Sequence, residues 1–365
     1  MTLVLNDEDV SQVLTMADCI RALEDAFRDI ALGSAVNAPR RDSFMVSSRP
    51  DAYYSFKTIE GGLERLGVVA QRINSDLITY PVIDGVARRV KVPAAPGNRY
   101  VGLVFLYSSE TLELLAVLTD GHVQRMRVAG STGVGAKHLA REDARTAALL
   151  GSGWQAEAAA WALPEVRPLT TLRVFSPNRE HREAFAKGVA STLGIDVTPV
   201  GSTREAVQGA DIVACATNSH GPEPVVSGEL IEPGMHLTSI VSSDFDDEGW
   251  QKSDLIFFSS PGGPTGHPTY TSENPMLSSV PSDARLAHWE RERFERHREK
   301  IYMLPDLLTG KAPKRTDSSQ ITMLNKNWGL GIEFASVAKL VYDRARAAGI
   351  GKELPTEWFS QTSHP

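Results

Sequence analysis

The spacing of hydrophobic positions changes part-way along this chain. Between residues 15 and 33, apolar side chains from Ile20 to Ile30 recur three and four residues apart, which predicts an amphipathic helix that Gly33 ends. Between residues 52 and 118, short β-rich runs such as "YYSFKTIEG" and "YVGLVFLYSS" are separated by Gly, Pro and Asp residues. This pattern predicts an antiparallel sheet, with residues 77–100 as an irregular excursion between two of its strands.

After Asp120 the pattern becomes an alternation of strands and helices. The small-residue run "VQRMRVAGSTGVGAKHLARE" predicts a helix that leads into strands such as "TAALLG", "TLRVFS", "DIVACAT" and "DLIFFSS". Helix-like stretches, "WQAEAAAWAL" and "REHREAFAKGVASTLG" among them, lie between these strands. Such alternation is typical of βαβ units with a parallel sheet. A last amphipathic helix is predicted in "GIEFASVAKLVYDRARAAGIG".

A glycine-rich turn joins the first of these strands to its helix. In "GSGWQA", Gly151, Gly153 and Ala156 have the G-x-G-x-x-G/A spacing of a dinucleotide-binding turn. The N–H groups at the start of the following helix favour a phosphate there. We therefore expect cofactor contacts along the whole turn, although for Trp154 a packing role is favoured over a cofactor contact. The expected contacts are Gly151, Ser152, Gly153, Trp154, Gln155 and Ala156.

The end of the next strand selects between the two nicotinamide cofactors. An NAD-specific fold presents an acidic residue to the ribose 2′-hydroxyl, whereas this chain reads "RVFSPNREHR". Ser176, Asn178 and Arg179 could donate hydrogen bonds to a 2′-phosphate, which favours NADP(H) and leaves NAD(H) as the alternative. In the opposing interpretation, Arg179 and Arg182 only solvate the start of a helix.

Composition narrows the class of protein further. A length of 365 residues is comfortable for two domains, and the net charge of −7 gives no reason to expect a nucleic-acid or membrane partner. No apolar stretch approaches the roughly 20 residues that span a bilayer. The N-terminus lacks the features of a signal peptide. Cys19 and Cys215 lie far apart, and no histidine set has metal-ligand spacing, so we expect a cytoplasmic protein without a metal site.

Several motifs together resemble one known family. The helix "RMRVAGSTGVGAKHLARED", the turn "LLGSGWQAEAAAWAL", the segments "ADIVACATNS" and "GMHLTSIVSSD", and the helix "GIEFASVAKLVYDRA" are similar, in this order, to motifs of the ornithine cyclodeaminase/mu-crystallin family. The resemblance implies an α/β fold in which a Rossmann dinucleotide-binding domain, residues 126–319, is inserted in a discontinuous α+β domain for substrate binding and dimerisation, residues 1–125 and 320–365. It also implies a homodimer, a nicotinamide cofactor and a small amino-acid or imino-acid substrate.

The resemblance also implies roles for individual residues. Arg127 matches an arginine that binds the substrate carboxylate, and Arg40 or Arg41 matches a second one. Asp244 lies where the family has its catalytic aspartate, although its acidic run "DFDDE" could be only a solvated loop. Thr217 and Asn218 match positions that contact the nicotinamide ribose.

One catalytic position departs from the family pattern. Where the family has a lysine, this chain has Gln71 or Arg72. Arginine stays charged near neutral pH and cannot shuttle protons, so Arg72 is a candidate for substrate binding instead. Lys57, on a neighbouring strand, is the nearest lysine that could replace the missing one.

Three functions compete on this evidence. We expect an NADPH-dependent imine or ketimine reductase, or the reverse amino-acid dehydrogenase. The alternative is an ornithine cyclodeaminase-type ammonia-lyase with recycled NAD, which fits less well because the lysine is replaced and no acidic ribose selector is present. The third is a non-enzymatic binding protein, since mu-crystallin is known as a hormone-binding and lens protein, and Arg127 and Asp244 argue against it.

Overall fold

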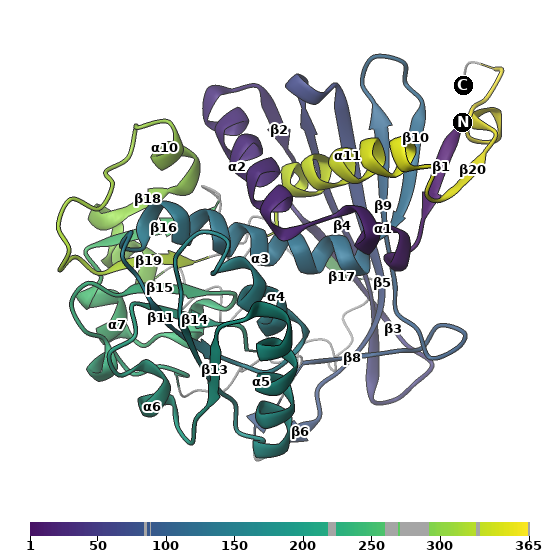
Figure 1. Ribbon diagram of the computed structural model, residues 1–365. Coiled ribbons are helices and arrows are strands. Elements are labelled where there is room, and N and C mark those ends of the chain that lie inside the picture. The colour runs from purple at the N-terminus through teal and green to yellow at the C-terminus, as the bar shows by residue number, and fades with distance from the viewer. Residues whose placement is uncertain are drawn as a thin grey trace.

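The computed structural model describes residues 1–83, 86–87, 89–217, 224–259, 269–270, 292–325 and 329–363. Two sheets organise these residues into two lobes (Figure 1). One sheet is mixed and mostly antiparallel, and the other is parallel throughout.

The mixed sheet contains both ends of the chain. Its strands, in spatial order, are β17 (Thr269–Tyr270), β3 (Arg41–Val46), β4 (Ala52–Leu63), β5 (Val68–Thr79), β9 (Val101–Ser108), β10 (Leu114–Thr119), β1 (Thr2–Leu5) and β20 (Lys352–Leu354). The pairs β4–β5, β5–β9 and β9–β10 are antiparallel, which confirms the predicted sheet of residues 52–118. Two short strands pair beside this path, β2 (Ala35–Asn37) with β4 and β8 (Val90–Val92) with β5.

The excursion predicted at residues 77–100 is more regular than expected. β5 continues to Thr79, β8 pairs back onto it, and β6 (Val82–Ile83) pairs with β7 (Val86–Ala87) in a separate hairpin. Buried and less buried positions alternate along β5 past residue 77, and the same face remains buried as far as Ile78. The end of β5 and β8 therefore extend the mixed sheet, whereas β6 and β7 form a two-stranded sheet of their own.

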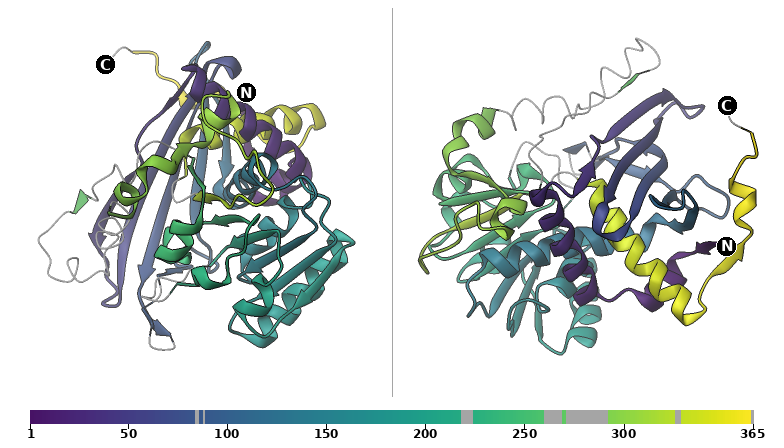
Figure 2. Two further views of the ribbon diagram at one scale, coloured as in Figure 1. Left: turned by 90° about the vertical axis from the view of Figure 1, so that its left-hand side faces the viewer. Right: turned by 90° about the horizontal axis from the view of Figure 1, so that it is seen from above.

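Helices cover one face of the mixed sheet, which we call the inner face. In the view from above, α2 (Met16–Leu32) and α11 (Gly331–Ala348) lie on the same side of the strands (Figure 2). The start of α11 touches the backbone of β4, where a Cβ on Gly61 would lie 2.3 Å from the backbone nitrogen of Ile332. Only glycine fits such a contact, so Gly61 sets how closely helix and sheet approach. The short α1 (Asp7–Val13) precedes α2.

The parallel sheet has the strand order of a doubly wound fold. Its strands, in spatial order, are β13 (Asp196–Pro199), β12 (Thr171–Phe175), β11 (Thr146–Leu150), β14 (Ile212–Cys215), β15 (His236–Ser239), β19 (Thr322–Asn325), β16 (Leu255–Phe258) and β18 (Ile301–Met303). The order reverses between β11 and β14, and such a switch point is where α/β folds bind ligands. The predicted fold class, with a Rossmann domain inserted in an α+β domain, is confirmed.

The strands of the parallel sheet are linked by helices and short turns. The helices are α4 (Trp154–Ala162), α5 (Arg179–Leu193), α6 (Thr203–Val207), α7 (Asp247–Lys252) and α10 (Leu304–Leu308). The 3₁₀ turns of the chain are η1 (Glu64–Leu66), η2 (Gly228–Leu230), η3 (Ser242–Asp244), η4 (Arg298–Lys300) and η5 (Thr356–Phe359).

Two segments connect the lobes. α3 (Asp120–Leu139) follows β10 of the mixed sheet and leads to β11 of the parallel one. The chain returns through β19, which pairs with β15 and β16. The second part of the discontinuous domain is predicted to begin at residue 320, and β19, up to Asn325, is still a strand of the parallel sheet. Within the described ranges, no helix is long and apolar enough to span a bilayer.

Candidate active site

The glycine turn has the geometry of a phosphate cradle. Gly151 has φ +121°, and a Cβ there would lie 2.5 Å from the carbonyl oxygen of Ala216, so only glycine fits. Gly153 precedes α4, and a Cβ on it would meet open space, which leaves room for a ligand against the backbone. Ala156 is fully buried under the turn, and Oε1 of Gln155 has no hydrogen-bond partner among the described residues. These features fit the pyrophosphate of a dinucleotide.

Trp154 is 46% exposed, and its ring lies beside Arg125. The Arg125 guanidinium lies 5.5 Å from the ring centroid of Trp154 and 4.2 Å from that of Trp161. Arg125 also pairs with Glu157 of α4. Arg125 therefore links α3 to α4 and contacts the ring of Trp154.

The residues expected to select the ribose lie together at the end of β12. Oγ of Ser176 and Oγ of Ser152 are 2.8 Å apart, so the selector strand and the glycine turn are in direct contact. The Asn178 side chain caps α5 by accepting a hydrogen bond of 2.9 Å from the His181 backbone. Arg179 is exposed and lies 2.7 Å from Glu183, an ion pair of the kind that is weak in water.

A buried carboxyl group lies at the carboxyl edge of the parallel sheet. Asp244, in η3 after β15, is fully buried, and Thr217 donates a hydrogen bond of 2.8 Å to its Oδ1. Its Oδ2 has no partner among the described residues. Burial raises the pKa of Asp244 to about 7, against the lowering effect of Thr217. A carboxyl group with this pKa can donate or accept a proton near neutral pH. Asn218 lies outside the described residues.

Two further polar side chains at this edge escaped the sequence interpretation. Ser239 ends β15, Asn325 ends β19, and the two are opposite each other in the sheet. Both are buried, and neither Oγ of Ser239 nor the amide of Asn325 has a hydrogen-bond partner in the part of the chain that is described. Buried polar groups without partners are costly, which indicates that a ligand completes this edge. Only their place at strand ends could have revealed them.

The inner face of the mixed sheet carries a row of charged side chains from β5. Arg72 donates to Oδ2 of Asp120 through Nε at 3.0 Å and Nη2 at 2.7 Å. Asn74 donates to the same oxygen at 3.0 Å. Gln71 points to the opposite face and donates to Glu60 at 3.0 Å. Of the two residues that could replace the family lysine, Arg72 is therefore the one on the inner face.

Arg127 lies next to Arg72 across an aromatic ring. Its guanidinium is 4.8 Å from the ring centroid of Phe334, and that of Arg72 is 5.5 Å from the same centroid. Arg127 donates to Oε2 of Glu333 at 2.9 Å and to Gln124. Both arginines are buried, and they hold two positive charges close together on α3 and β5.

The two early arginines point to different faces of β3. Arg40 donates twice to Asp42, at 2.7 and 2.6 Å. Asp42 is opposite Lys57 in the sheet, so the pair belongs to the inner face. Arg41 is exposed, and its position in β3 places it on the other face. Of these two arginines, Arg40 is therefore the one that contacts a side chain of the inner face.

Lys57 is buried beneath this row. Its Nζ lies 3.1 Å from Oδ2 of Asp76, and Lys91 lies 3.0 Å from the other oxygen of the same carboxylate. The pKa of Lys57 falls to about 7, mainly because of burial and then because of Arg89, although Asp76 opposes the shift. No group of three or more His, Cys, Asp or Glu side chains in the described ranges could hold a metal ion.

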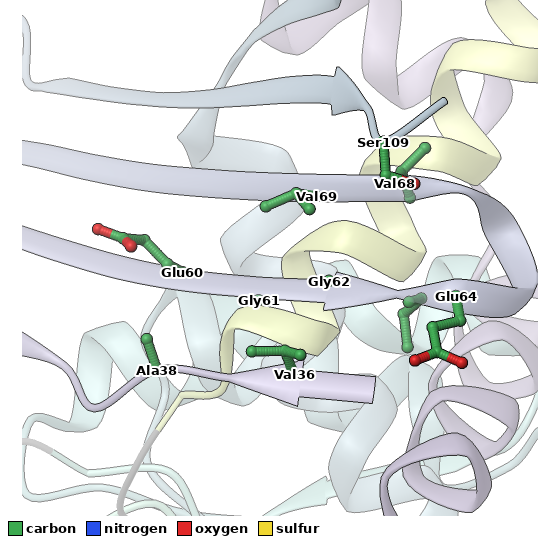
Figure 3. Close-up of a pocket in the computed structure, with 10 residues that line it drawn as sticks. Val36, Ala38, Glu60, Gly61, Gly62, Glu64, Val68, Val69 and Ser109 are labelled. Carbon is green, nitrogen blue, oxygen red and sulfur yellow. The ribbon is translucent and has the colours of Figure 1, made fainter. Parts of the chain in front are cut away.

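A groove on the outer face of the mixed sheet is separate from these groups. Figure 3 shows Val36, Glu60, Gly62 and Val69 along it, with Ser109 at one end. The positions of these strands alternate, so Glu60 and Val69 point away from Lys57 and Arg72. This groove is not part of the candidate active site.

Comparison with known proteins identifies the family. The model of the ornithine cyclodeaminase/mu-crystallin family matches residues 1–349. The chain belongs to this family. A protein of Rhizobium meliloti named as a dehydrogenase is 28% identical over 343 residues, covering 92% of each chain.

Solved structures of the family share the fold. The Δ1-pyrroline-2-carboxylate reductase of Thermococcus litoralis, in complex with NADH and L-proline, superposes with a TM-score of 0.77 at 24% identity and covers 97% of this chain and 100% of its own. An archaeal alanine dehydrogenase dimer with bound NAD gives a TM-score of 0.73 at 22% identity and covers 97% and 99%. The resemblance of the sequence motifs to this family is therefore confirmed.

Proposed function

We propose that this protein is a nicotinamide-dependent imine or ketimine reductase, or in the reverse direction an amino-acid dehydrogenase, that acts on a small amino or imino acid. The observation that carries the proposal is Asp244, a buried carboxyl group with one unpartnered oxygen and a pKa of about 7, at the same sheet edge as the glycine turn. The dinucleotide complexes of related reductases and dehydrogenases support it.

The chemistry needs one hydride and one proton. A reduced nicotinamide cofactor held at the glycine turn would supply the hydride to the carbon of the C=N bond. Asp244 gives its proton to the nitrogen, so that the imine becomes an amine and the carboxyl group becomes a carboxylate. Thr217 holds Oδ1, which leaves Oδ2 to face the substrate. Among the described residues, Lys57 also has a pKa of about 7. Its ammonium is already engaged with Asp76, whereas Oδ2 of Asp244 has no partner there, so we assign the proton to Asp244.

Arginines of the inner face would bind the substrate carboxylate. Arg72 and Arg127 each keep N–H donors beyond those that their acidic neighbours accept, and Arg40 lies on the same face. A guanidinium binds a carboxylate through two parallel hydrogen bonds, which orients the substrate as well as holding it. Arg72, which takes the place of the family lysine on this face, stays charged and cannot shuttle protons. This argues against the repeated proton transfers of a cyclodeaminase.

The direct test is a cofactor assay. Purified protein with NADPH and a panel of 2-oxo acids plus ammonium, or of preformed cyclic imines, should oxidise the cofactor and form the matching amino acid. Absence of cofactor oxidation with every member of the panel, together with intact cofactor binding, would contradict the proposal.

For the cofactor we propose a preference for NADP(H), with Ser176, Asn178 and Arg179 near the ribose. Arg179→Ala should raise the Kd of NADPH by about 10–100-fold, the loss of one charge-assisted contact, and change that of NADH little. Arg204→Ala is the matched control, since Arg204 is also exposed and paired with a glutamate, Glu229. Fluorescence titration measures both constants. An equal effect on the two cofactors, or a preference for NADH in the unmodified protein, would rule out this selector.

We also propose a homodimer, formed through the outer face of the mixed sheet. Exposed Val69, Val101 and Tyr107 make that face apolar, and Val36 extends it along the groove of Figure 3. An apolar face of this kind is usually covered in solution. Light scattering at micromolar concentration should give about twice the 39.7 kDa of one chain, whereas a monomer mass would disprove the dimer.

The buried free thiols Cys19 and Cys215 are in keeping with a cytoplasmic location.

A further inference from the structure

One corner of the inner face holds more positive than negative charge. Asp76 of β5 lies between two ammonium groups, with Lys57 3.1 Å from one oxygen and Lys91 3.0 Å from the other. Arg89 is close enough to lower the pKa of both lysines. Asp42, opposite Lys57 in the sheet, adds a second carboxylate, and its partner Arg40 adds a fourth cation. Among the described residues, two carboxylates therefore face four cations at the corner formed by β3, β4, β5 and β8.

The surplus is confined to this corner. The arginines that line the rest of the inner face each contact an acidic side chain of their own. These pairs are Arg72–Asp120 and Arg127–Glu333.

The same corner holds buried donors that lack acceptors. The Lys57 side chain is 3% exposed, and of its three N–H groups one has an acceptor, Oδ2 of Asp76, within the described ranges. Ser55 is two residues away on the same face of β4, is fully buried, and its Oγ has no partner there. Buried donors without acceptors are costly, and an ammonium more than a hydroxyl. An anion at this corner would satisfy both.

We propose that Ser55, Lys57 and Lys91 form a subsite for a second anionic group of the substrate, so that the preferred substrates are imino acids with a carboxylate side chain. This inference rests on the proposed function. Lys57 then binds the anion instead of carrying the catalytic proton.

The spacing along β5 suits a short dicarboxylic acid. Asn74 is opposite Lys57 in the sheet and lies two residues after Arg72 on the same face. Residues two apart on a strand are separated by about 6.6 Å. A substrate with the skeleton of 2-oxosuccinate or 2-oxoglutarate could thus reach from the arginines to the lysines. A monocarboxylic substrate would leave the corner unsatisfied.

The test separates binding from catalysis. Calorimetric titration of the full-length protein, loaded with cofactor, compares succinate and glutarate with butyrate, and 3-phosphonopropionate distinguishes a phosphate-type from a carboxylate-type distal group. We expect the dicarboxylates to bind at least about tenfold more tightly than butyrate, as one charge-assisted contact provides. If butyrate binds as tightly as the dicarboxylates, the proposed subsite does not exist. If 3-phosphonopropionate binds more tightly than the dicarboxylates, the subsite recognises a phosphate-type group and not a carboxylate.

Variants make the test specific. Lys91→Met removes one charge from a half-exposed side chain, and should lower dicarboxylate affinity about tenfold while butyrate affinity stays the same. Lys91→Arg should restore binding, and Ser55→Ala should weaken it in the same selective way. Lys187→Met on the exposed face of α5 is the control. An equal loss for both ligands in Lys91→Met would contradict the subsite. Absence of hydride transfer with intact dicarboxylate binding would instead count against the proposed function alone.

Discussion

Asp244→Asn is expected to lower kcat for imine reduction by about 10²–10⁴-fold, the contribution of a positioned general acid. Asparagine keeps the shape of the side chain and can still interact with Thr217, so cofactor affinity and the melting temperature should change little. Asp247→Asn is the matched control, because Asp247 belongs to the same acidic run but pairs with Arg293 and Arg296. Equal kcat in Asp244→Asn and the unmodified protein would mean that the acidic run is only structural.

The pH dependence gives an independent measure of the same group. With a pKa of about 7, Asp244 is protonated below that pH, and reduction requires this form. The kcat/KM of reduction should therefore fall as the pH rises through about 7, whereas amino-acid oxidation, which needs the carboxylate, should rise over the same range. Asp244→Asn should remove this limb from both profiles. A limb that persists in the variant would assign it to another group, with Lys57 as the first candidate.

Arg127→Lys is expected to raise the substrate KM by about 10–100-fold, because an ammonium keeps the charge but loses the planar pair of donors. The lysine can still pair with Glu333, so the fold should survive, and a thermal melt verifies this. Cofactor affinity should barely change, since Arg127 lies on the inner face of the mixed sheet and not at the glycine turn.

The control for this substitution is Arg344→Lys, an arginine of α11 that pairs with Asp18 away from the site. Steady-state kinetics with saturating cofactor gives KM for both variants. An unchanged KM in Arg127→Lys would place the substrate carboxylate at Arg72 or Arg40.

Local patterns predicted the fold and the glycine turn well. The βαβ alternation and the G-x-G-x-x-A spacing depend on residues that are neighbours in the chain, and they led to the parallel sheet and to the cradle at Gly151. The end of β12 was harder to predict. The sequence could not indicate that Asn178 caps α5 or that Arg179 lies against Glu183 one turn later.

Strand register decided what the sequence left open. A shift of one residue moves every side chain of a strand to the other face, so Gln71 and Arg72 could not be separated without the pairing of β5 with β4. The same reasoning distinguishes Arg40 from Arg41. The contact between Arg72 and Asp120 joins residues 48 positions apart, and that between Arg127 and Glu333 joins residues 206 positions apart. No local pattern indicates such pairs.

Net hydride transfer distinguishes a reductase from a cyclodeaminase, and the balance of cofactor against product measures it. Two reaction mixtures are compared, one with NADPH, a 2-oxo acid and ammonium, and one with ornithine and NAD. In each, the amounts of oxidised and reduced cofactor, ammonia and amino acid are followed together. We predict one NADPH oxidised for each amino acid formed from the 2-oxo acid. Formation of proline and ammonia from ornithine in equal amounts, without net reduction of NAD, would contradict the account and establish a cyclodeaminase.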